Sequence, residues 1–156
     1  MASEICRRLG FNHAEYSLAI HKDMVVSKCP CFTDIHTESI TCRQIMNDTI
    51  DDYDSYIEKL ELEGIQDARI KMENMFILDY LILNEDRHLN NFGIIRNVDT
   101  LKWMDVAPIF DNGQSLNIHY YDEYKFFFEI KPFNEMFQVV HDFNRIDINV
   151  LQDLPA

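Results

Sequence analysis

The stretch NEDRHLNNFG (residues 84–93) gathers acidic, basic and amide side chains directly after an apolar segment. Its Asp86 precedes Asn91 by five positions, and a loop of that length presents both side chains to one volume. Aspartate and asparagine also cap helices and form turns, which is the structural alternative for this pair. The segments on either side decide between the two interpretations.

The segments that flank this loop predict a helix before it and a hairpin after it. The preceding residues, DARIKMENMFILDYLILN (67–84), are dense in apolar side chains, which predicts a helix that begins at Asp67 and is buried on most sides. The following residues, FGIIRNVDTLKWMDVAPIFDNG (92–113), predict two strands joined by a turn at 97–100. Asp111 follows this hairpin. The order is therefore helix, polar loop, hairpin and second aspartate.

This order of elements fits phosphoryl transfer from ATP. The reaction needs an aspartate that orients the attacking hydroxyl and accepts its proton. It also needs amide and carboxylate oxygens to hold Mg²⁺, a cation that prefers oxygen ligands and neutralises the charge that develops during transfer. The hairpin returns the chain, so we expect Asp111 to face the loop that carries Asp86 and Asn91.

The residues LNEDRHLNNFGIIRN (83–97) and WMDVAPIFDNGQSL (103–116) resemble the C-terminal lobe of HipA-like serine/threonine kinases, which are toxin-type bacterial kinases. The resemblance implies an ATP-dependent protein kinase that uses Mg²⁺. On the matching positions, it implies that Asp86 is the catalytic base and that Asn91 and Asp111 are the Mg²⁺ ligands.

The resemblance also implies a set of residues around the nucleotide: Glu4, Cys29, Cys31, Arg87 and His88. Within this set, Arg87 and His88 are expected to shape the catalytic loop. Direct participation in catalysis is the alternative role for His88.

The N-terminal residues ASEICRRLGF (2–11) resemble the helix that packs behind the nucleotide in these kinases. Ser3 is its expected N-cap and Gly10 its expected end. Glu4 is then the candidate partner of the ATP-anchoring lysine. The alternative is a surface acid that stabilises the first turn of the helix.

The residues EYSLAIHKDMVVSKCPCF (15–32) predict a hairpin with its turn at 22–23. The end of this segment falls where HipA-like kinases have the hinge between their lobes, so backbone groups near Cys29 and Cys31 are expected to meet adenine. A metal site is the alternative for the Cys-Pro-Cys motif. Structural zinc sites, however, generally use two separated pairs of ligands.

The residues DIHTESITCRQIMNDTIDDYDSYIEKLELEG (34–64) are acidic. Thr37 or Ser39 is the expected cap of a helix here, and Gly64 closes the segment. Between Asp48 and Glu63, seven acids stand against a single Lys59 and form what we call the acidic strip: Asp48, Asp51, Asp52, Asp54, Glu58, Glu61 and Glu63. The strip is interpreted as a solvated helical face, or alternatively as a docking surface for a basic partner.

The composition restricts the possible partners. The formal net charge of −13 disfavours direct binding to nucleic acid or to anionic membranes, whose phosphates repel it. No apolar run approaches the ~18 residues that a membrane span needs. The four cysteines are expected to remain thiols, and the expected location is a reducing cytoplasm.

We expect an α+β fold that corresponds to a truncated protein kinase. Residues 1–36 form an N-lobe remnant of helix, hairpin and hinge, and residues 37–156 form a mainly helical C-lobe with the catalytic hairpin. Near the C-terminus, an aromatic strand at 124–130 and a helix after Pro132 are predicted. The incomplete sheet at the N-terminal side leaves an edge uncovered, which favours aggregation or a dimer.

The sequence departs from the kinase pattern in its phosphate-binding elements. Its four glycines are scattered and form no phosphate loop, and Lys22 and Lys28 follow the first helix instead of preceding it. Little or no kinase activity is therefore expected from this chain alone, because poor positioning of the triphosphate costs orders of magnitude in rate. The alternative function is a non-catalytic acidic binding or inhibitor protein that engages a basic partner surface, such as one that binds nucleic acid.

Overall fold

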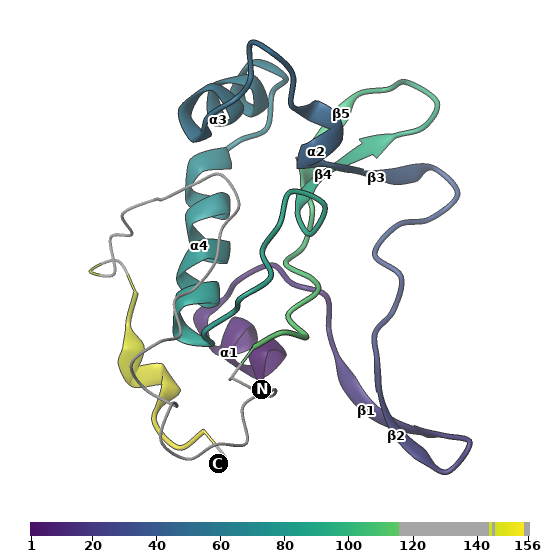
Figure 1. The fold of residues 1–156 in the computed structure, drawn as a ribbon, viewed down its shortest axis with the longest axis vertical. Helices are drawn as coiled ribbons and strands as arrows, with labels where there is room; N and C mark the ends of the chain where they lie inside the picture. Colours follow the sequence, from purple (N-terminus) through teal and green to yellow (C-terminus); the bar gives the residue numbers. More distant parts are fainter. Residues whose placement is uncertain (116–143, 145, 155–156) are drawn as a thin grey trace.

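The computed structural model describes residues 1–115, 144 and 146–154 (Figure 1). The aromatic strand and the helix expected at 124–143 lie outside these residues. In chain order the described elements are α1 (Ala2–Leu9), β1 (Ser17–His21), β2 (Met24–Lys28), β3 (Thr37–Thr41), α2 (Cys42–Ile45), α3 (Tyr53–Leu62), α4 (Ala68–Leu81), β4 (Gly93–Asn97), β5 (Trp103–Val106) and the 3-10 helix η2 (Ile148–Leu151). This is a mixed fold of helices and small sheets, as the sequence predicts. None of the described helices combines the length and apolar character that crossing a membrane requires.

Helix α4 is the central element of the fold (Figure 1). It begins directly after Asp67, as the apolar run predicts, and it buries the side chains of residues 75–78. The prediction of burial on most sides is wrong at two positions, because Ile70 and Tyr80 are about half exposed. The last buried position of the helix is an acid, Asp79, which is only 3% exposed.

Strands β3, β4 and β5 form an antiparallel sheet in that order. The β4–β5 hairpin confirms the prediction, and its turn is closed by the side chain of Asn97, whose Oδ1 accepts hydrogen bonds from the backbone of Asp99 and Thr100 at 3.0 and 2.8 Å. The polar loop leads directly into β4, and the segment that carries Asp111 follows β5. The two segments are therefore attached to the same sheet.

The prediction that Thr37 or Ser39 caps a helix is wrong, because both residues lie in β3 and pair with β4. The caps are instead Thr41 for α2 and Asp52 for α3, and each forms a reciprocal capping box with the residue three positions later. The capping signal of serine and threonine is local. The pairing of β3 with β4 joins residues more than fifty positions apart, and it overrides that signal.

The N-terminal region consists of α1 and the β1–β2 hairpin. The end of α1 at Gly10 is confirmed, since this residue has φ 71° and caps the helix in the left-handed conformation. Ser3 is not the N-cap, because Met1 occupies that position and Ser3 lies inside the helix. Ser3 Oγ instead accepts a hydrogen bond from the backbone N–H of Tyr16 at 3.3 Å.

The β1–β2 hairpin turns at 22–23 as predicted, with positive φ at both residues. It projects away from the helices (Figure 1), and it pairs with no third strand within the described residues. Leu18, Ile20 and Val25 share one face of it and are 81%, 79% and 72% exposed. The described sheet therefore has the uncovered edges that the sequence predicts.

The hydrophobic core is continuous from the N-terminal helix into the rest of the chain. Ile5 and Cys6 of α1 belong to the same buried cluster as Leu60 of α3 and Met75 of α4. The four helices and the β3–β4–β5 sheet therefore share one core, and the polar loop between α4 and β4 lies at its edge.

Candidate active site

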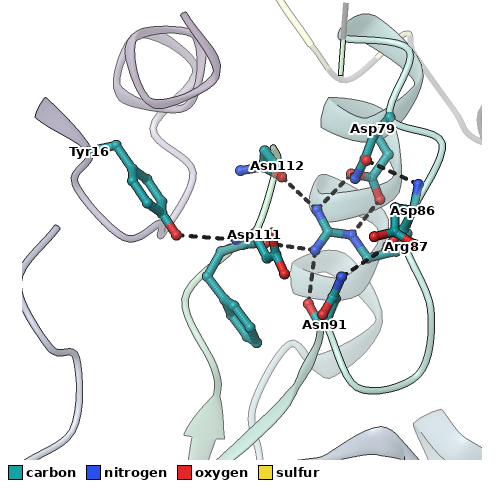
Figure 2. A network of polar contacts seen from close by, with 9 residues as sticks. Tyr16, Asp79, Asp86, Arg87, Asn91, Asp111 and Asn112 are labelled. Atoms are coloured by element: carbon teal, nitrogen blue, oxygen red, sulfur yellow. Dashed lines mark hydrogen bonds and ion pairs between the residues drawn. The ribbon is translucent and has the colours of Figure 1, made fainter. Parts of the chain in front are cut away.

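The site is organised around a buried ion pair between α4 and the polar loop (Figure 2). Arg87 is fully buried, and its Nε and Nη2 donate to the two carboxylate oxygens of Asp79 at 2.9 and 2.8 Å. Asn84, also fully buried, donates to Asp79 Oδ1 at 2.8 Å. A buried charge is tolerated only when it is paired and hydrogen-bonded, and the two-point geometry meets both conditions.

The same guanidinium joins the polar loop to the segment that follows the hairpin. Arg87 Nη1 donates to the backbone oxygens of Asn91 and Phe110, each at 2.8 Å. Its Nη2 also donates to Asn112 Oδ1 at 2.6 Å. A single buried side chain therefore fixes the backbone at Asn91 and next to Asp111, and Figure 2 shows it between α4 and the Asp111 segment. This brings the two segments of the predicted site together.

Asp86 and Asn91 are held to each other within the loop. Asn91 Nδ2 donates to the backbone oxygen of Asp86 at 3.0 Å, which turns Asn91 Oδ1 away from that bond. The backbone N–H of Asp86 donates to Asn84 Oδ1 at 3.2 Å, and the carboxylate of Asp86 is about half exposed. His88 Nε2 lies 4.0 Å from Asp86 Oδ1. The loop thus offers an accessible carboxylate beside an oriented amide oxygen.

Asp111 has a left-handed backbone conformation, with φ 51°. This conformation is strained for a residue with a side chain, and such strain concentrates at functional sites. The backbone N–H of Asp111 donates to the hydroxyl of Tyr16 at 3.3 Å, and burial raises the pKa of that tyrosine. Tyr16, the residue directly before β1, therefore contacts the candidate metal residue.

The donor atoms around this loop fit Mg²⁺. The carboxylate of Asp111 and the Oδ1 of Asn91 are hard oxygen ligands, and neither accepts a hydrogen bond from another described residue. Within the described part of the chain, no three His, Cys, Asp or Glu side chains gather into a metal-binding group. An Asn–Asp pair leaves further coordination positions for water and phosphate oxygens, as Mg²⁺ sites do.

Glu4 makes its contacts on its own helix. It accepts hydrogen bonds from Arg7 at 2.6 and 2.9 Å and from Arg8 at 2.8 Å, and among the described contacts it makes none with the polar loop or with residues 110–115. The hydrogen bonds from Arg7, and then those from Arg8, lower the pKa of Glu4 to about 2. Its geometry is that of a surface acid in the first turn of α1.

The expected hinge lies beside the Asp111 segment. The ring of Phe32 packs on that of Phe110 with centroids 5.3 Å apart. Cys29 is half-buried and interacts with the Tyr16 hydroxyl, whereas Cys31 is exposed and contacts the Thr33 hydroxyl at 3.3 Å. All four cysteines are free thiols. The structure thus brings the Cys29 end of the hinge, and not the Cys31 side chain, toward the site.

Four polar residues of this site were not predicted as site residues from the sequence: Tyr16, Asp79, Asn84 and Asn112. Asp79 had a detectable signal, because it is the single acid within the apolar run 75–83. A buried acid requires a cationic partner, and Arg87 follows it by eight residues. Tyr16 and Asn112 carry no comparable local signal, since their partners are distant in the sequence.

Comparisons with known proteins relate part of the chain to a kinase. No family model matches the chain. The serine/threonine-protein kinase CtkA of Helicobacter pylori strain J99 is 27% identical over 132 aligned residues, which cover 74% of this chain and 39% of that protein. The chain therefore spans about two fifths of this relative's length.

A solved structure shows the same likeness in three dimensions. The crystal structure of the H. pylori proinflammatory kinase CtkA superposes with a TM-score of 0.61 at 24% identity, over 74% of this chain and 46% of that one. The TM-score shows a shared fold, and the likeness covers part of that kinase. The chain is therefore kinase-like, and it has part of the fold of a serine/threonine kinase.

Proposed function

We propose that this chain is the catalytic lobe of a HipA-like, ATP-dependent protein serine/threonine kinase, with weak or no phosphotransfer by itself. The supporting observation is the buried guanidinium of Arg87, which fixes the loop of Asp86 and Asn91 against the segment of Asp111. Weak activity is expected because the four glycines of these 156 residues are scattered and form no phosphate-binding loop.

In this proposal each residue has one role. The half-exposed carboxylate of Asp86 orients the substrate hydroxyl and accepts its proton. Asn91 Oδ1 and the Asp111 carboxylate would hold Mg²⁺, and the bound metal would supply positive charge against the charge that develops on the phosphate. Arg87 positions Asn91 and the Asp111 segment. Its guanidinium donates to five acceptor atoms on four residues, Asp79, Asn91, Phe110 and Asn112.

Mg-ATP is expected to stabilise the chain against heat, and the effect should depend on Asp111. A ligand at ten times its Kd stabilises the folded state by about 1.4 kcal/mol, which raises Tm by about 3–5 °C for a chain of this size. Asp111→Ala should abolish most of this shift, and Asp48→Ala, an exposed acid of the acidic strip, should preserve it. The measurement is a thermal melt with and without Mg-ATP. Equal shifts in wild type and Asp111→Ala, or no shift in wild type, would contradict the proposal.

A second function is favoured by the exposure of the acidic strip, all seven of whose acids face solvent on α3 or in the residues before and after it. We propose as the alternative a non-catalytic binder whose acidic strip engages a basic protein surface, including one that binds nucleic acid. Exposed charges accelerate such association and make it sensitive to salt.

The binder alternative predicts that capture of a basic partner is lost at high salt and after neutralisation of the strip. The variant is Asp51→Asn, Asp52→Asn and Asp54→Asn together, in which the asparagine at 52 preserves the cap of α3. Its control neutralises three acids elsewhere, Glu15, Asp23 and Asp99. Capture is measured by pull-down, and equal loss in both triple variants would argue against a specific acidic surface.

A further inference from the structure

The Cys-Pro-Cys motif and the residue after it contact the candidate site at two points. The ring of Phe32 packs on that of Phe110, with centroids 5.3 Å apart. The thiol of Cys29 interacts with the hydroxyl of Tyr16, and that hydroxyl accepts a hydrogen bond from the backbone N–H of Asp111 at 3.3 Å. A chemical change at Cys29 therefore reaches Asp111 through a single intervening side chain.

The four thiols of the chain have different surroundings. Cys6 and Cys42 are fully buried, Cys29 is half-buried and Cys31 is exposed. Burial raises the pKa of Cys6 to about 12, whereas hydrogen bonds from the side chain and the backbone of Thr33 lower the pKa of Cys31. The thiolate is the form of cysteine that reacts with oxidants, and it must be accessible to them. Cys31 is therefore the thiol that an oxidant reaches first.

Cys29 lies within disulfide reach of Cys31. Two residues of chain span at most about 7 Å, and disulfides join Cα atoms that are about 4.4–6.8 Å apart. Cys6 and Cys42 are instead enclosed in the hydrophobic core. A ring that closes over a single proline is small, and strained or exposed disulfides are the readily reduced ones that serve regulation. The Cys29–Cys31 pair is thus suited to reversible oxidation.

Metal binding is less well supported for this pair of thiols. Among the residues that the structure describes, no third His, Cys, Asp or Glu side chain gathers with the two thiols. A structural zinc site needs four ligands, and Cys31 leaves its sulfur open to solvent. The contacts and the exposure of the pair therefore favour redox chemistry.

We propose that Cys31 is a modification site for peroxides, and that Cys29 converts the modified thiol into a Cys29–Cys31 disulfide that loosens the Asp111 segment. The regulatory part of this proposal rests on the proposed nucleotide site. The new bond draws the Cys29 sulfur toward the exposed Cys31 and away from the Tyr16 hydroxyl. Asp111, whose backbone is strained at φ 51°, then loses the oriented acceptor of its N–H.

The chemistry balances with hydrogen peroxide as the oxidant. The Cys31 thiolate attacks one peroxide oxygen, so that an S–O bond forms, the O–O bond breaks, and the hydroxide that leaves takes up a proton. The Cys29 thiolate then attacks the sulfur of the resulting sulfenic acid. An S–S bond forms, the S–O bond breaks, and the second hydroxide is protonated to water. The two thiols are oxidised by the same pair of electrons that reduces the peroxide.

Treatment of the full chain with hydrogen peroxide tests the modification. Intact mass and peptide mapping should find the Cys29–Cys31 disulfide, reversed by dithiothreitol, with Cys6 and Cys42 still thiols. Cys29→Ser should stop at the sulfenic acid of Cys31, which dimedone traps, and Cys31→Ser should keep Cys29 as a thiol. A wild-type chain in which Cys31 stays a thiol, or in which the first disulfide involves Cys6 or Cys42, overturns the proposal.

The effect on the site is measured on reduced and oxidised protein by two readouts. Oxidation should shift the amide resonance of Asp111, leave that of Ile94 in place, and reduce by about half or more the rise in Tm that Mg-ATP causes. In Cys31→Ser, which controls for oxidation elsewhere in the chain, peroxide should have neither effect.

The two readouts separate the switch from the kinase proposal. A disulfide that leaves the Asp111 resonance unmoved overturns the switch. A moved resonance with an unchanged Mg-ATP effect overturns the regulation and preserves the kinase proposal. A moved resonance in a protein that Mg-ATP never stabilises supports the link from Cys29 to Asp111 and overturns the kinase proposal.

Discussion

Replacement of Arg87 by methionine is expected to lower the free energy of unfolding by about 3–5 kcal/mol, the usual cost of removing one partner from a buried ion pair. The change leaves the carboxylate of Asp79 without its cation, at a position that is 3% exposed. It also leaves the backbone oxygens of Asn91 and Phe110 without their shared donor. A loss of this size is a large fraction of the stability of a typical domain.

Urea denaturation followed by circular dichroism measures this loss. The control is Arg69→Met, because Arg69 pairs with Asp54 at the surface, where both side chains are largely exposed, and such pairs contribute at most about 1 kcal/mol. The double variant Asp79→Leu with Arg87→Met should recover part of the loss, since it removes the unpaired buried charge. A loss for Arg87→Met no greater than that for Arg69→Met would show that the buried network does not hold the loop.

Gly93→Ala is expected to destabilise the chain by about 3 kcal/mol, at the upper end of what overpacking costs. A Cβ at this position would lie 2.0 Å from the backbone oxygen of Ile40 and 2.8 Å from the Cα of Thr41. These are backbone atoms of β3, which pairs with β4 at this residue, so no side chain can move to make room. The two strands must separate, and the displacement reaches Asn91 two residues earlier.

Gly113→Ala is the matched control, because the nearest atom to its new Cβ is Asp111 Oδ1 at 3.8 Å, an ordinary contact. This variant should remain within about 0.5 kcal/mol of wild type. Thermal melts give the stability of both variants, and amide hydrogen exchange at Ile94 reports whether β4 has separated from β3. Equal stability of the two alanine variants would contradict the close approach of β3 and β4.

Local patterns predicted much of the framework around the site. The apolar run 67–84 predicted α4, and the turn residues at 97–100 predicted the hairpin, because helix periodicity and turn chemistry act over a few residues. The left-handed turn at 22–23 and the end of α1 at Gly10 were predicted for the same reason. These elements place the polar loop correctly between α4 and β4.

Contacts between distant residues were not predicted. Thr37 and Ser39 carry the local signal of a helix cap, and yet they form β3 because β4 offers them a partner. Ser3 carries the same signal, and its hydroxyl contacts the backbone of Tyr16 instead. The contacts of Glu4 are local instead: it was expected to pair with an ATP-anchoring lysine, and it pairs with two arginines one turn away on its own helix.

The sequence by itself determined the order of helix, polar loop, hairpin and second aspartate, and with it the candidates Asp86, Asn91 and Asp111. The tertiary structure decided what holds them together, because Asp79 and Phe110 become neighbours of Arg87 only when α4 and the hairpin pack on one core. It also shows that NEDRHLNNFG joins α4 to the segment of Asp111 through the side chain of Arg87. A buried charge must find its partners wherever the fold places them, and here those partners fix the loop against the segment that carries Asp111.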